Sequence, residues 1–185
     1  MKIKTLKFNF LMNMLLTVSN FLFPLITFPY VSRVLSPIGT GKVAFAYSIV
    51  SYFSIFAAFG VANYGIRACA QVRDDKEKLS KTVQEILLIN IVLMSFVYIV
   101  YFLGIVFIPE LKVEKTLFLI SGLNILFTIV GVEWLYRGIE QYFYITIRSI
   151  IFKLIAFVLV FTCVKTETDY SAYAFIIIFA TVGSG

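Results

Sequence analysis

The sequence has no histidine, only two cysteines and few charged residues, and each shortage excludes a class of function. Without histidine, and with Cys69 and Cys163 far apart along the chain, it offers neither a Cys/His metal site nor a disulfide framework. It also shows no nucleophile elbow, phosphate-binding loop or dinucleotide fingerprint. We therefore expect no catalytic residues, no metal and no cofactor, and a function other than that of an enzyme.

Charged residues make up only 14% of the 185 residues, while 61% are hydrophobic and the mean hydropathy is +0.96. A water-soluble domain of this length would need more charged surface. The apolar residues form long continuous runs, whereas the strands of a membrane β-barrel alternate apolar and polar residues. Because lipid tolerates only helices and closed barrels, the sequence predicts an all-α integral membrane protein.

Six apolar runs are candidates for transmembrane helices, which need about 20 residues each. They cover residues 8–31, 43–66, 82–108, 116–136, 147–164 and 172–185. We expect a single transmembrane domain over residues 1–185, with the first run retained as a helix despite Pro24 and Pro29. The last run is short and ends without a basic residue, a pattern that indicates a truncated unit.

The net charge of +6 comes from 16 lysines and arginines, most of which lie between the apolar runs. This distribution favours membrane orientation over nucleic-acid binding. If the N-terminus is cytoplasmic, eleven of them belong to the cytoplasmic side: Lys2, Lys4, Lys7, Arg67, Arg73, Lys76, Lys78, Lys81, Arg137, Arg148 and Lys153. The other five belong to the outside: Arg33, Lys42, Lys112, Lys115 and Lys165. The excess predicts a cytoplasmic N-terminus.

Six asparagines fall inside the predicted helices: Asn9, Asn13, Asn20, Asn63, Asn90 and Asn124. Polar side chains within a bilayer either join helices by hydrogen bonds or line a wet path. The sequence leaves both roles open.

Glu133 and Arg137 are four residues apart, so they share a helix face and are expected to pair. Trp134 and Tyr136 are expected to anchor the same helix end at the membrane interface. Glu133 is then either part of an anchored helix end or a carboxylate that takes up a proton during transport.

Three parts of the chain, in this order, resemble one family of membrane proteins. The first is residues 20–35, which end in FPYVSRVL. The second is GVANYGIR at residues 60–67, followed by RDDKEKLSK at 73–81. The third is EWLYRGIEQY at residues 133–142, which runs into YITIRS at 144–149. Together they resemble the polysaccharide-biosynthesis flippases (Wzx-type O-antigen transporters) of the multidrug/oligosaccharidyl-lipid/polysaccharide exporter superfamily.

The resemblance implies a fold and a function. Members have twelve or more helices in two lobes, so this chain would supply about one lobe. They translocate undecaprenyl-diphosphate-linked oligosaccharide across the bacterial inner membrane by alternating access. No cofactor is expected, and a proton or sodium gradient would drive the step. Expected partners are the lipid-linked substrate, membrane lipids, and the polysaccharide polymerase and chain-length proteins, with no nucleic acid.

The same resemblance directs attention to polar residues near the membrane. Candidates for contact with the anionic head group are Arg33, Arg67, Arg137 and Arg148. Candidates for contact with sugar or water are Asn63, Asn90 and Asn124. Glu133 is the candidate for coupling to the ion gradient.

Three alternatives stay open. A drug or cation exporter of the same superfamily would need acidic residues in its cavity, and these are scarce within the predicted helices. A membrane-bound enzyme of the same pathway would rely on large outer loops, and the predicted outer connectors are short. The third alternative is a non-functional fragment of a flippase.

Overall fold

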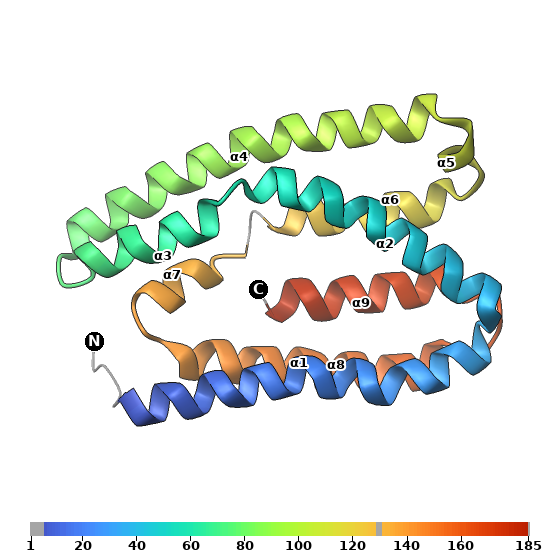
Figure 1. Ribbon diagram of the computed structural model, residues 1–185, viewed down its shortest axis with the longest axis horizontal. Helices are drawn as coiled ribbons and strands as arrows, with labels where there is room; N and C mark the ends of the chain where they lie inside the picture. Colours follow the sequence, from blue (N-terminus) through green and yellow to red (C-terminus); the bar gives the residue numbers. More distant parts are fainter. Residues whose placement is uncertain (1–5, 129–130, 185) are drawn as a thin grey trace.

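The computed structural model describes residues 6–128 and 131–184, and every regular element in these ranges is a helix. Lys2, Lys4 and Gly185 lie outside the described residues. The long helices run side by side and form an elongated bundle (Figure 1). The helix bounds are α1 Leu6–Val34, α2 Ser36–Ala58, α3 Val61–Val72, α4 Lys76–Phe107, α5 Pro109–Val113, α6 Lys115–Thr128, α7 Glu133–Gly138, α8 Tyr142–Cys163 and α9 Tyr170–Ser184. The predicted all-α fold is confirmed.

Within the described residues, four helices are long and apolar enough to cross a membrane: α1, α2, α4 and α8. Two further apolar helices, α6 and α9, are shorter. These six helices occupy the places of the six predicted spans, and α6 and α9 begin within two residues of the predicted starts. α4 and α8 begin earlier than the predicted starts at residues 82 and 147, and two other predicted spans are interrupted.

The predicted span over residues 43–66 is wrong at both ends. α2 begins earlier, at Ser36, with a proline in its first turn, where a missing N–H costs no helical hydrogen bond. Phe59 and Gly60 then adopt left-handed backbone angles, with φ of 31° and 76°. Two successive left-handed residues stop an α-helix, and glycine reaches that conformation without steric cost. The rest of the predicted span belongs to the separate helix α3.

The predicted span over residues 116–136 is also interrupted. α6 ends at Thr128, and Gly131 and Val132 are not helical; residues 129–130 lie outside the described ranges. Glycine is a poor helix former, and Glu133 starts the new helix α7. As a result α7 packs against α3 instead of extending α6 (Figure 1).

Two large apolar cores hold the long helices together, and α9 takes part in both; a third, smaller cluster joins α3, α4 and α7. The first joins α2, α4 and α6 with Ala174 of α9, around the buried Tyr101, whose hydroxyl donates to the backbone oxygen of Phe118 at 2.6 Å. The second joins α1, α8 and α9 around residues such as Ile176. α1 and α2 therefore belong to different cores. They meet at the turn before Ser36 and diverge toward the opposite end of the molecule (Figure 1).

The short helices α3 and α7 interlock through glycines. A Cβ on Gly65 would lie 2.5 Å from Cε3 of Trp134, and a Cβ on Gly138 would lie 2.9 Å from the Cβ of Cys69. Both distances are shorter than van der Waals contact, so a larger residue would force a shift. Trp134 is only 5% exposed. The expectation that Trp134 anchors a helix end at the membrane interface is therefore wrong, because its ring packs on Gly65.

A polar cluster fastens the bundle at the end where α1 meets α2. Lys42 of α2 pairs with Glu114, directly before α6, with an Nζ–Oε1 distance of 2.5 Å. Tyr170 of α9 donates its hydroxyl hydrogen to Oε2 of Glu114 at 2.9 Å. The hydrogen bond from Lys42 holds the pKa of Glu114 below its ordinary value. The cluster thus links α2, α6 and α9 outside the apolar cores.

Substituting Gly65→Ala is expected to destabilise the protein by about 1–3 kcal/mol, because the added methyl group overlaps Trp134. Trp134 is the only tryptophan, so unfolding in detergent micelles can be followed through its fluorescence, and the native emission is expected to move to longer wavelength. Gly41→Ala is the matched control, since no atom lies within 4 Å of its added methyl group. Equal stability of the two variants would contradict the interlock.

Candidate functional site

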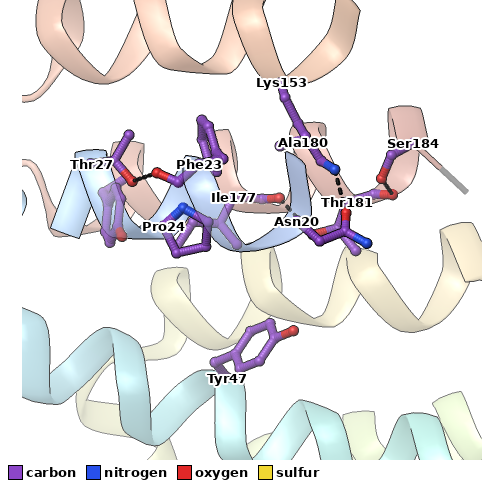
Figure 2. A pocket seen from close by; sticks show the side chains of 11 residues that line it. Asn20, Phe23, Pro24, Thr27, Tyr47, Lys153, Ile177, Ala180, Thr181 and Ser184 are labelled. Atoms are coloured by element: carbon purple, nitrogen blue, oxygen red, sulfur yellow. Dashed lines mark hydrogen bonds between the residues drawn. The ribbon is translucent and has the colours of Figure 1, made fainter. Parts of the chain in front are cut away.

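A cavity of about 340 Å³ lies between α1 and α2, with α8 and α9 completing its wall. We call it the central cavity. Polar side chains from all four helices line it, among them Asn20, Thr27, Tyr47, Lys153, Thr181 and Ser184. Figure 2 shows Lys153 and Asn20 pointing toward each other, with Tyr47 approaching from α2. Hydroxyl, amide and ammonium groups therefore line one cavity between helices, three of which are long and apolar enough to cross a membrane.

Lys153 supplies the positive charge of the central cavity. It lies halfway along the 22-residue helix α8. Its Nζ donates to Oγ of Ser19 at 2.9 Å and also to Oδ1 of Asn20, both on α1. A lysine at the centre of a membrane helix costs about 2.5–3.5 kcal/mol on insertion scales, so polar partners are required. These partners are neutral, so they satisfy N–H groups without cancelling the charge.

The local sequence of α1 shapes its side of the cavity. Pro24 has no N–H, so the carbonyl of Asn20, four residues earlier, loses its usual helical donor. Thr27 is buried and donates its hydroxyl hydrogen to the backbone oxygen of Phe23 at 2.8 Å. α1 nevertheless continues through Pro24, and it presents the amide side chain of Asn20 where it faces Lys153.

A smaller cavity of about 230 Å³ adjoins the central one. Asn124 of α6 and Glu133 of α7 line it, and Thr181 and Ser184 of α9 line both cavities. Glu133 and Lys153 therefore line two cavities that share part of their wall. Two of the predicted site residues are thus next to the central cavity.

Two predicted arginines lie near the same end of α9. Arg137 pairs with Glu133 as their spacing predicts, with Nη2 and Nε at 2.6 Å and 2.9 Å from Oε1. Arg148 donates from Nη2 to the backbone oxygen of Ser184 at 3.2 Å. Its guanidinium carbon lies 5.4 Å from the ring centroid of Tyr144, a cation–π distance. The structure therefore brings both arginines to the Glu133 end of the cavity.

A family model described as "Polysaccharide biosynthesis protein" matches residues 6–185. The chain belongs to the polysaccharide biosynthesis protein family. Two similar proteins are each named "Putative O-antigen transporter". The one from Escherichia coli (strain K12) is 27% identical over 158 residues, which cover 85% of this chain and 38% of the relative. The one from Shigella dysenteriae is 27% identical over 170 residues, which cover 92% of this chain and 42% of the relative.

This member of the polysaccharide biosynthesis family spans about two fifths of the length of these curated relatives. No solved structure shows a significant match to it. Both relatives carry the name of a transporter. Together with the apolar helices, they identify a multi-pass membrane protein.

The other four predicted site residues of this family member lie away from the central cavity. Arg33 is exposed in the last turn of α1, at the opposite end of the bundle from α7 (Figure 1). Asn63 and Arg67 are exposed on α3. Asn90 is buried within α4. Their roles in binding stay predictions.

Sequence reasoning missed Lys153 as a site residue: it counted Lys153 among the cytoplasmic charges, although the predicted span over residues 147–164 contains it. The structure corrects this, because Lys153 lies inside α8 and faces Ser19 and Asn20. The signal was present: a single lysine interrupts an apolar run that otherwise carries no charge after Arg148. Such an isolated intramembrane charge points to function by default.

Water is expected to reach the central cavity from outside the bilayer. Thr181→Cys, in a Cys163→Ser background that removes the exposed native thiol, should react with a charged, membrane-impermeant methanethiosulfonate in membrane vesicles. Phe96→Cys is the control, since this α4 residue is 69% exposed on an apolar helix face and would lie in lipid. Similar reaction rates at both positions would contradict a wet cavity.

Proposed function

We propose that the protein translocates an anionic, lipid-linked oligosaccharide across the bacterial inner membrane. The observation that carries this proposal is the polar central cavity with Lys153 at membrane depth. The relatives named as O-antigen transporters support a polysaccharide substrate. The whole activity is attributed to the protein in its natural length, because the chain spans about two fifths of its relatives.

The chemistry of the cavity fits the polar head of such a substrate. Sugar hydroxyls both donate and accept hydrogen bonds, and the hydroxyls of Tyr47, Thr181 and Ser184 can match them. A phosphate or diphosphate carries negative charge, which makes hydrogen bonds to Lys153 charge-assisted and strong. Moving these groups through bare hydrocarbon would cost many kcal/mol. The cavity replaces water around them and so lowers the barrier.

The charge of the lining argues against the drug or cation exporter. Among the described residues that line the central cavity, Lys153 is charged and no aspartate or glutamate occurs. A hydrophobic cation would be repelled by this lining, whereas an anion would be attracted. The cation exporter is therefore the second candidate, favoured only by Glu133 in the adjoining cavity.

The transport cycle is also part of the proposal. α1 and α2 diverge toward the end of the bundle that carries the N-terminus (Figure 1). With a cytoplasmic N-terminus, the cavity would load from the cytoplasm, and alternating access would release the substrate outside. A proton or sodium gradient acting on Glu133 would drive the cycle. The arginines Arg137 and Arg148 would guide the anionic head from the cytoplasmic side.

Complementation tests this function. The 185-residue chain and the complete reading frame that encodes it are expressed in a bacterium that lacks its O-antigen flippase, and surface polysaccharide is measured. Rescue is expected from the complete frame, and Lys153→Gln should lower it about 10- to 100-fold, the effect of losing a charged hydrogen bond of about 1.5–3 kcal/mol.

Two variants control for charge and folding. Lys153→Arg keeps the positive charge and should retain rescue, and Lys165→Gln removes an exposed cation in the connector before α9 and should leave rescue unchanged. Full rescue by Lys153→Gln at normal membrane abundance would contradict the proposed role of the cavity.

A further inference from the structure

Lys153 also lines a different cavity, which is mostly apolar. Its volume is about 250 Å³, and it lies between α1 and α8. Apart from Ser19 and Lys153, its lining is apolar and includes Leu22, Ile26 and Leu154. These three side chains are exposed, so the cavity opens on the outer surface of the bundle. We call it the α1–α8 seam.

The seam and the central cavity share two side chains, Phe23 and Lys153. On α1, Asn20 and Pro24 line the central cavity, while Leu22 and Ile26 line the seam. The 3.6-residue helical period places these residues on neighbouring faces of one helix. Lys153 therefore lies at the boundary between a polar space on one side and an apolar space on the other.

The change from a polar to an apolar space at Lys153 matches the change along a lipid-linked saccharide at its phosphate. A lipid-linked saccharide consists of a polar sugar part, an anionic phosphate part and an apolar chain, in that order. The central cavity, Lys153 and the seam present matching surroundings in the same order. The hydrogen bonds of Lys153 go to the neutral acceptors of Ser19 and Asn20, so an anion would be a stronger partner than either.

We infer that the apolar chain of the substrate leaves the central cavity through the α1–α8 seam while its phosphate lies on Lys153. This inference rests on the proposed function and adds the place of the lipid chain. The head group then crosses inside the bundle, and the chain stays in the bilayer. Phe23, which lines both spaces, would have to turn aside for the chain to pass.

Binding of two ligands to the protein in maltoside micelles tests the seam. Undecaprenyl diphosphate has the chain, and inorganic diphosphate lacks it. Leu154→Trp should narrow the seam and raise the Kd for undecaprenyl diphosphate about 10- to 100-fold, because the chain would keep the phosphate from Lys153. The Kd for inorganic diphosphate should not change. Val158→Trp, one turn further along the exposed face of α8, should change neither Kd.

The outcomes separate the seam from the proposed function. Lys153→Gln should raise the Kd for both ligands. An unchanged Kd for undecaprenyl diphosphate in Leu154→Trp would overturn the seam and leave the anion site standing. An unchanged Kd for both ligands in Lys153→Gln would instead remove the anion site, and the seam proposal with it.

Photolabelling provides a second measurement on the unaltered protein. Undecaprenyl diphosphate with a diazirine on the isoprene unit next to the phosphate should label residues 150–157 of α8. Excess unlabelled undecaprenyl diphosphate should prevent the labelling, and excess phosphatidylglycerol should not. Equal competition by phosphatidylglycerol would overturn the proposal, because the seam would then be a general site for bilayer lipid.

Discussion

A positive charge in the middle of a membrane helix needs polar partners, and this requirement organises the structure around Lys153. The ammonium group reaches Ser19 and Asn20 on α1, so α1 and α8 must lie side by side at that depth. Pro24 disturbs α1 one turn further on, where the same helix faces the central cavity. The polar cavity exists where it does because the charge, its partners and the proline meet there.

The rest of the bundle holds this arrangement in place. α9 packs into both apolar cores, so it fixes the distance between the α1–α8 side and the α2–α4–α6 side. Lys42, Glu114 and Tyr170 fasten α9 to the α2–α4–α6 side at the end where α1 meets α2. At the other end, Gly65 and Trp134 bind α3 to α7, and α7 carries Glu133 to the adjoining cavity. Segments that resemble the family thus serve packing.

Hydropathy predicted the fold class and most helix positions, because long apolar runs leave little choice in lipid. It failed at Phe59–Gly60 and near Gly131, where backbone conformation interrupts an apolar run without changing its hydropathy. The pairing of Glu133 with Arg137 was predictable because their contact is local. The neighbours of Lys153 were not, since they lie 133 and 134 residues away in the sequence. Arg33 lies at the opposite end of the bundle from α7 (Figure 1), a position that its charge alone does not reveal, and its role stays a prediction.

The most direct test of the account is an experimental structure of the protein, at its natural length, with a lipid-linked oligosaccharide bound. The account predicts a phosphate oxygen about 3 Å from Nζ of Lys153, within hydrogen-bond distance, and sugar density in the central cavity. A structure in which Lys153 keeps its bonds to Ser19 and Asn20, while the phosphates lie outside the central cavity, would contradict it.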